Sequence, residues 1–266
     1  MPVTYKGHEL LISKLYDAQR RVSEGHQQVV TFFLTPAEQE IAKTICRQAK
    51  PVFIGGYPDA ERRCALFDPA ISSEANGWAE DDPEQDAFIP VIQNRLAEIV
   101  CLKAESEKGK PELRHPDVLG ALLHLGISRE ALGDIVCSGR KIYLFCKRSA
   151  ADLILHELCR IGSSNIRFEE ISCAEVPAPE REILNINVSS LRYDAVVSAL
   201  ARTSRSKAGD LIRSGLVKIN DVVLDHKGEL CNNDVVSIRR SGRFRFLGIK
   251  KTTRKDRLVL EFLKYS

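Results

Sequence analysis

The chain has 266 residues, of which 44% are hydrophobic and 28% are charged, a composition typical of a globular protein with two or three compact domains. Its formal net charge of +3 is unevenly distributed. Residues 190–266 contain 17 Lys and Arg against 8 Asp and Glu, whereas residues 1–189 contain 22 against 28. Because basic segments attract polyanions, this asymmetry points to a polyanionic partner for the carboxy-terminal part.

Targeting and cofactor signals are weak throughout the sequence. The first residues lack the basic-then-apolar order of a signal peptide, and no apolar run approaches the ~18 residues of a membrane span. We therefore expect a cytoplasmic protein that does not interact with membranes. The eight cysteines are at least nine residues apart, whereas zinc ligands typically lie two to four residues apart. Since glycine-rich nucleotide loops are also missing, we expect free thiols, no metal, no cofactor and no small-molecule substrate.

The first expected domain, residues 1–85, mixes helices and strands. Its first helix is predicted over residues 6–24, with an apolar side formed by Leu10, Leu11, Ile12 and Leu15. A second helix begins at Thr35, which can cap it, followed by Pro36 at the first helical position and Glu38 in a capping box.

Two short strands follow, at residues 51–54 and 64–67, on either side of a turn at residues 55–58. We interpret Gly55-Gly56 as a plain turn, and Arg62 and Arg63 as surface ion-pairing residues rather than RNA contacts. The acidic stretch at residues 72–86 is predicted to be a linker.

The second expected domain, residues 86–172, has the order β-α-β-β-α-β. The predicted elements are strand 96–103, helix 116–125, strands 134–137 and 141–147, helix 150–161 and strand 165–170. This order predicts the split ferredoxin-like arrangement of many RNA-recognition domains, although the order alone fixes no function. Tyr143 and Phe145 alternate onto one strand face, where they either stack on bases or pack in the core, and we favour the core.

After a linker at residues 173–182, a small basic module that ends in a basic tail is expected over residues 183–266. Helices are predicted at residues 191–201 and 205–214, the second capped by Thr203 or Ser204 and followed by a left-handed Gly215. Strands are predicted at residues 216–219, 222–224 and 235–240, so that two helices lie on a small sheet. The whole chain is thus predicted to be α+β.

The start of the helix at residues 205–214 is the candidate site. Free backbone N–H groups, the positive end of the helix dipole and two cations meet there and suit a phosphate; the residues are Ser204, Arg205, Ser206 and Lys207. Six further cations extend this positive surface: Arg192, Arg213, Lys218, Arg239, Arg240 and Arg243. In the alternative interpretation, Arg192 only pairs with Asp194 or Asp210, and the basic residues at 239–243 only protect a strand edge.

Several segments carry a family resemblance. Residues 190–194, 204–208, 211–212, 215–220 and 233–237 resemble the RNA-binding domain named after small-subunit ribosomal protein S-four. Residues 53–63, 115–123, 125–129, 133–135 and 242–244 resemble the YlmH family, and this resemblance covers nearly the whole chain.

The resemblance implies a non-enzymatic factor that binds ribosomal RNA of the large subunit during rescue or quality control of stalled translation, beside peptidyl-tRNA. It also implies a central domain of RNA-recognition-like fold, and it marks Arg192 and Arg205 as essential RNA contacts. Two alternatives stay open: an RNA-modifying enzyme similar to pseudouridine synthases, and a division-associated protein that binds nucleic acid.

Overall fold

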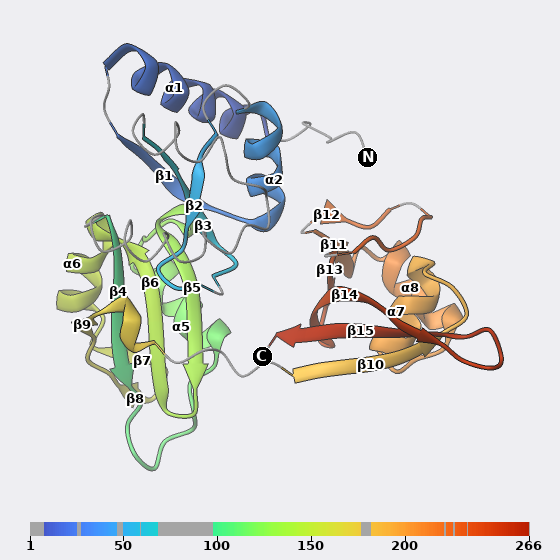
Figure 1. The fold of residues 1–266 in the computed structure, drawn as a ribbon. Coiled ribbons are helices and arrows are strands. Elements are labelled where there is room, and N and C mark those ends of the chain that lie inside the picture. Colours follow the sequence, from blue (N-terminus) through green and yellow to red (C-terminus); the bar gives the residue numbers. More distant parts are fainter. Residues whose placement is uncertain are drawn as a thin grey trace. The chain divides into compact units, whose positions relative to one another are not determined.

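The computed structural model describes residues 8–25, 28–46, 50–58, 60–68, 98–176, 182–220, 222–225, 227–232 and 234–265. The chain divides into two compact units, Met1–Pro179 and Glu180–Ser266. Both units combine helices with antiparallel sheets, as the α+β prediction requires (Figure 1). The linker predicted at residues 72–86 lies outside the described residues, as do residues 177–181 of the second predicted linker.

The first half of unit 1 is a three-stranded sheet with two helices. Its elements are α1 (Glu9–Gly25), β1 (Val29–Leu34), α2 (Pro36–Ile45), β2 (Val52–Ile54) and β3 (Arg63–Phe67). The strands are antiparallel in the order β1-β3-β2. The helices pack on one face of this sheet, where Leu15 and Ala42 share a core with Phe67.

The predicted capping box at α2 is confirmed. The Glu38 N–H donates to Thr35 Oγ1 at 3.4 Å, and the Thr35 N–H donates to Glu38 Oε2 at 2.7 Å. The apolar side predicted for α1 was partly wrong, because Leu10 is 68% exposed. The buried side of this helix follows the 3.6-residue period instead and consists of Leu11, Leu15, Ala18 and Val22. Strand β1 was not predicted, since its apolar run lacks the polar alternation of a half-buried strand.

The second half of unit 1 is a four-stranded antiparallel sheet. Its main elements are β4 (Ile99–Glu105), α5 (His115–His124), β5 (Leu132–Ser138), β6 (Lys141–Lys147), α6 (Arg148–Glu157) and β9 (Glu169–Ile171), with strand order β5-β6-β4-β9. Helices α5 and α6 pack on one face through Val118, Leu122 and Ile154.

The two sheets of unit 1 share a core. Phe33 and Ile54 of the three-stranded sheet pack with Cys101 and Phe145 of the four-stranded sheet. Unit 1 is therefore layered as helices, three-stranded sheet, four-stranded sheet and helices, and each sheet is covered on both faces.

The segment after α6 differs from the prediction. The helix ends at Glu157 instead of residue 161, because residues 160–161 form β7 (Arg160–Ile161), which pairs with β8 (Ser164–Asn165). Gly162 has a φ of +57°, which permits the tight turn between these strands. The last strand accordingly starts at Glu169 rather than residue 165.

Unit 2 is a six-stranded antiparallel sheet with two helices. Its elements are β10 (Glu182–Val188), α7 (Tyr193–Leu200), α8 (Arg205–Arg213), β11 (Val217–Ile219), β12 (Val222–Val223), β13 (Val235–Ile238), β14 (Gly242–Thr252) and β15 (Leu258–Tyr265). The strand order is β10-β15-β14-β13-β11-β12. The helices cover one face, where Val196 and Ala208 pack with Phe246 and Phe262. Gly215 has a φ of +67°, which confirms the predicted left-handed end of α8.

Two features of unit 2 correct the sequence analysis. The carboxy-terminal residues, expected to form a basic tail, instead form the long strands β14 and β15. In β14, Phe244 and Phe246 alternate with exposed residues and point into the core. Strand β10 begins at Glu182, where a linker was expected to end. It was not recognised because its inward residues, Ile186 and Val188, are buried only by pairing with β15, which is distant in sequence.

Candidate nucleic-acid interface

The start of α8 has the expected geometry. Ser204 is the N-cap, and its hydroxyl accepts a hydrogen bond from the Lys207 N–H at 3.3 Å. The first turn contains no acidic residue, and the side chains of Arg205, Ser206 and Lys207 are exposed. Since the N–H groups of a first turn have no partner inside the helix, those of Arg205 and Ser206 are available to an anion.

Arg192 and Arg205 both act on the carboxylate of Asp194. The Arg192 Nε donates to Asp194 Oδ1 at 3.0 Å, so the local ion pair considered as an alternative is formed. The hydrogen bond from Arg192 lowers the pKa of Asp194, and the charge of Arg205 lowers it further. Arg205 is held by a hydrogen bond from its guanidinium to Ser189 Oγ at 2.9 Å. The side chains of Arg192, Asp194 and Arg205 carry one net positive charge, and the Glu229 carboxylate, whose residue pairs with Arg192 in an isolated β-bridge, also acts on Arg192.

The remaining predicted cations do not all lie near the start of α8. Arg213 lies at the opposite end of α8, roughly 12 Å along the helix axis, where it forms an ion pair with Asp210. Arg239 and Arg240 lie in the turn after β13 and are exposed, and Arg240 has a positive φ of +68°.

Lys218 and Arg243 lie on the sheet. Ser237 of β13 pairs with Lys218 of β11 on one side and with Arg243 of β14 on the other. Val217 and Phe244, which neighbour Lys218 and Arg243 along their strands, point into the core that the helices cover. Because side chains alternate along a strand, Lys218, Ser237 and Arg243 therefore lie on the opposite face of the sheet. The ten predicted residues therefore fall into three places: five lie around the start of α8, four lie on the outer face of the sheet or in its turn, and Arg213 lies at the far end of α8.

Unit 1 does not present Tyr143 and Phe145 as a base-stacking surface. Both side chains are buried, at 5% and 0% exposure, and the Phe145 ring stacks on Tyr57 with centroids 4.7 Å apart. The core interpretation is confirmed. Gly56 explains how the rings fit, because a Cβ at this position would lie 2.3 Å from the Phe145 ring. The glycine turn is therefore a packing element of unit 1.

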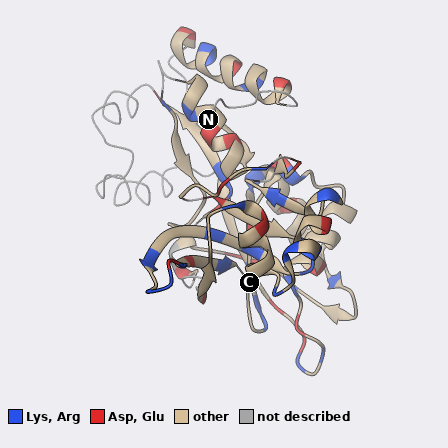
Figure 2. Cartoon of the chain, turned by 90° about the vertical axis from the view of Figure 1, so that its right-hand side faces the viewer, with Lys and Arg blue, Asp and Glu red and all other residues tan. Residues whose placement is uncertain are grey.

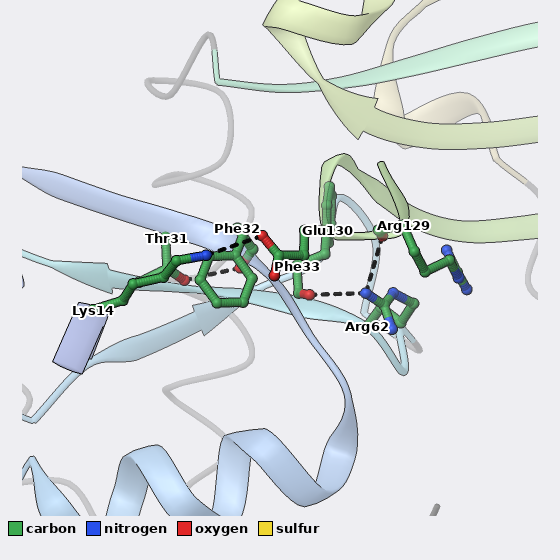
Figure 3. A network of polar contacts seen from close by, with 7 residues as sticks. All are labelled: Lys14, Thr31, Phe32, Phe33, Arg62, Arg129 and Glu130. Atoms are coloured by element: carbon green, nitrogen blue, oxygen red, sulfur yellow. Dashed lines mark hydrogen bonds and ion pairs between the residues drawn. The ribbon is translucent and has the colours of Figure 1, made fainter. Parts of the chain in front are cut away.

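Arg62 and Asp134 connect the two halves of unit 1. The Arg62 guanidinium donates to the carbonyls of Leu132, Phe33 and Arg129 at 2.8–3.1 Å, as Figure 3 shows for the last two. The Asp134 carboxylate accepts from the Tyr57 hydroxyl at 2.9 Å and from the backbone N–H groups of Glu61 and Arg62. Burial and the Asp134 carboxylate raise the pKa of Tyr57. Arg62 thus binds protein carbonyls in this structure.

A cationic segment at the end of β14 and in the turn to β15 was missing from the predicted site. It contains five exposed cations within eight residues: Lys250, Lys251, Arg254, Lys255 and Arg257. Figure 2 shows where Lys and Arg lie along the ribbon of the chain. The charge density was visible in the sequence, but only the strand pairing reveals that the segment is an ordered hairpin.

Across the described ranges, no cluster of metal-binding side chains is found, and the eight cysteines are free thiols. Within the same ranges, none of the helices is both long and apolar enough to span a membrane.

Comparison with known proteins places these features in a family. Residues 98–175, which contain the four-stranded sheet, match a family model described as the putative RNA-binding domain in YlmH. The chain is 33% identical over 263 residues to the Ribosome-associated protein quality control protein P2 of Bacillus subtilis (strain 168), covering 97% of this chain and 95% of that protein. The chain belongs to the YlmH family. Among solved structures, it is similar to the Cell division protein ylmH from Streptococcus pneumoniae, with 15% identity, a TM-score of 0.49 and coverage of 66% of this chain and 98% of that one.

Proposed function

We propose that this protein is a non-enzymatic, ribosome-associated factor that holds structured RNA. The observation that carries the proposal is the start of α8, where exposed Arg205 and Lys207 flank N–H groups suited to a phosphate and no carboxylate lies in the first turn. The name of the Bacillus subtilis relative and the family of residues 98–175 support the same function.

The architecture we infer has three domains. Residues 1–85 form an amino-terminal domain, residues 86–172 a ferredoxin-like domain similar to RNA-recognition domains, and residues 183–266 an S-four-like domain. The strand order β5-β6-β4-β9, with two helices on one face, supports the central assignment. The pairing of α7 with α8 over an antiparallel sheet supports the last one.

The start of α8 binds RNA by charge and by hydrogen bonding. Arg205 and Lys207 neutralise phosphates, and the N–H groups of the first turn donate to phosphate oxygens. The Asp194 carboxylate orients Arg192 by accepting its hydrogen bond. Together, Arg192, Arg205 and Asp194 carry one positive charge. Hydrogen bonds of this charge-assisted kind each stabilise a complex by about 1.5–3 kcal/mol.

The RNA is, in this proposal, ribosomal RNA of the large subunit, held beside peptidyl-tRNA during quality control of stalled translation. Its contacts are the residues around α8, namely Arg192, Ser204, Arg205, Ser206 and Lys207. Lys218 and Arg243 on the outer face of the sheet, Arg239 and Arg240 in the turn, and Arg213 at the end of α8 are contacts of lesser weight.

Sedimentation of the purified full-length protein with separated ribosomal subunits tests this function. We expect binding to the large subunit at low salt, and at least about tenfold weaker binding for Arg205→Ala. The matched control is Arg21→Ala, an exposed cation of α1 in unit 1. If Arg205→Ala binds the large subunit as well as the control does, the start of α8 is not the RNA-binding site. If the wild-type protein does not bind the large subunit, the proposed function is wrong. Nucleoside analysis of bound RNA is expected to find no new modification; a modified nucleoside shows that the protein is an enzyme.

A further inference from the structure

The hairpin formed by β14 and β15 extends beyond its neighbouring strand. β13 pairs with β14 only from Gly242 to Arg245, whereas β14 and β15 remain paired as far as Thr252 and Leu258. In Figure 1 the red loop between β14 and β15 reaches past the short strands of this sheet. From Leu247 onward, one edge of β14 is therefore not paired to any strand in the described part of the chain.

This extension, which we call the basic ribbon, carries Lys250, Lys251, Arg254, Lys255 and Arg257. Lys250 pairs with Glu261 at 2.7 Å, and the Arg257 guanidinium donates to the Asn187 carbonyl at 3.1 Å. Lys251, Arg254 and Lys255 are exposed and form no hydrogen bond or ion pair with the residues that the structure describes. Three positive charges of the ribbon are therefore free to meet an external anion.

The turn that holds these cations is ordered by its own hydrogen bonds. The Thr253 N–H donates to the Arg257 carbonyl at 2.7 Å, and the Asp256 N–H donates back to the Thr253 carbonyl at 3.1 Å. The Arg257 N–H also donates to Thr253 Oγ1 at 3.1 Å. Because the backbone is already fixed, binding through this turn orders only side chains, which lowers its entropic cost.

The side chains of the ribbon favour one form of RNA. Its large exposed apolar residues are the aliphatic Leu247 and Ile249, at 40% and 50% exposure, and no aromatic residue lies between positions 247 and 258. Proteins that bind single strands stack bases on aromatic rings, whereas double-stranded RNA is recognised through its shape and its phosphates. Cations without stacking rings therefore suit the backbone of a duplex.

We propose that the basic ribbon binds the phosphate backbone of double-stranded RNA through Lys251, Arg254 and Lys255, as a contact separate from the start of α8. This inference rests on the proposed function in that the partner is RNA. It adds a second site and specifies a duplex as its ligand.

Protection of the open β14 edge is the competing role for these cations, because charged side chains at a strand edge hinder pairing with other chains. Charge of either sign serves that purpose, whereas RNA binding requires positive charge. Replacement by Glu separates the two roles. Lys251→Glu/Arg254→Glu/Lys255→Glu is expected to keep the oligomeric state of the wild-type protein and to lose duplex binding.

The experiment measures binding of the full-length protein to a labelled RNA hairpin of about 20 base pairs and to a single strand of equal length, at several salt concentrations. For Lys251→Ala/Arg254→Ala/Lys255→Ala we expect at least tenfold weaker duplex binding at low salt. The slope of log affinity against log salt should become shallower by about two to three. The matched control, Arg20→Ala/Arg21→Ala/Lys43→Ala in α1 and α2, removes the same charge from unit 1.

The outcomes separate this inference from the proposed function. If Arg205→Ala/Lys207→Ala weakens duplex binding but the ribbon variants bind like the control, the ribbon is not a contact and the inference is wrong while the function stands. An equal loss for single-stranded RNA overturns the duplex assignment. If the wild-type protein sediments with the large subunit but binds neither RNA, this inference is wrong while the proposed function stands.

Discussion

Individual residues at the start of α8 combine a structural role with a binding role. Ser204 satisfies the Lys207 N–H and so stabilises the helix end, while Arg205 and Lys207 supply charge beside it. The Arg192–Asp194 pair shows the cost of this arrangement, because a carboxylate that orients one cation also reduces the positive potential nearby. Substitutions at the cap can therefore separate stability from RNA binding.

Ser204 variants are expected to separate these two roles. Ser204→Asp keeps a good N-cap and should leave the free energy of unfolding nearly unchanged, but its carboxylate should weaken RNA binding by repelling phosphate. Ser204→Ala should lose about 1 kcal/mol of stability and weaken RNA binding less than Ser204→Asp does, because it removes one contact without adding a repelling charge. Urea unfolding and RNA titration of the two variants check this pair of expectations. Weaker RNA binding by Ser204→Ala than by Ser204→Asp contradicts it.

Buried thiols predict how the stability of the protein depends on pH. Burial raises the pKa of Cys46 to about 11, and that of Cys64 and Cys146 to about 12, from the ordinary value of 9.0. Above pH 9 the unfolded chain therefore releases protons that the folded chain keeps. Stability from these groups is complete below pH 9 and decreases as the pH rises toward 11–12.

We expect the free energy of unfolding to fall between pH 9 and 11, with each buried thiol contributing up to about 1.4 kcal/mol per pH unit. Cys64→Ala should make this decrease shallower, although the variant starts from a lower stability because it leaves a small cavity. Denaturant unfolding at several pH values measures the slope. An unchanged slope in Cys64→Ala indicates that this thiol does not contribute. Cys231→Ala, at an exposed cysteine, is the control.

At the scale of elements, turns and strand ends position the layers of unit 1. The turn after β2 brings Gly56 against Phe145, and the start of β5 brings Asp134 to the segment around Glu61. Gly56 lies in residues 53–63 and Asp134 in residues 133–135, two of the segments that resemble the YlmH family. In this structure they join two sheets, and the face of the four-stranded sheet that contains Phe145 is covered by the three-stranded sheet.

Gly56→Ala is expected to destabilise unit 1 by roughly 2–4 kcal/mol, because its φ of +96° disfavours a side chain and the new Cβ would meet the Phe145 ring. Gly139→Ala is the matched control: its φ is +56°, but nothing lies within 4 Å of a Cβ there. Thermal or urea unfolding compares the two. Equal destabilisation shows that backbone strain alone, and not contact with Phe145, fixes the glycine.

Asp134→Ala should destabilise unit 1 by about 2–4 kcal/mol, because the Tyr57 hydroxyl and two backbone N–H groups lose a charged acceptor. Asp152→Ala, at an exposed position of α6, is the control and should change stability by less than about 0.5 kcal/mol. Urea unfolding measures both. We expect RNA binding of the folded Asp134→Ala protein to persist, since the proposed contacts lie in unit 2.

At the scale of the whole molecule, the charge is divided between the units. The proposed contacts and the basic ribbon belong to unit 2, whereas unit 1 contains the segment that matches the YlmH RNA-binding family. Attraction to phosphate by many exposed cations is weakened by salt, so RNA affinity should depend steeply on ionic strength. The stability of unit 1 depends on buried packing and should change little over the same range.

The sequence by itself determined the features that depend on neighbours along the chain. The capping box at Thr35 and the left-handed Gly215 follow from residues within one or two helical turns, and the same local signals narrowed the cap of α8 to Thr203 or Ser204, of which the structure shows Ser204. Local hydrogen bonds and summed charge need no knowledge of distant segments.

Only the tertiary structure decided which strands pair and which faces are buried. The pairing of β10 with β15 joins residues 70 to 82 positions apart, and the covering of Phe145 by Tyr57 joins the turn after β2 to the four-stranded sheet. The division of the predicted cations between the start of α8 and the outer face of the sheet is another example. An apolar or basic residue looks the same in the sequence whichever surface it meets, because burial and proximity arise only when distant segments pack together.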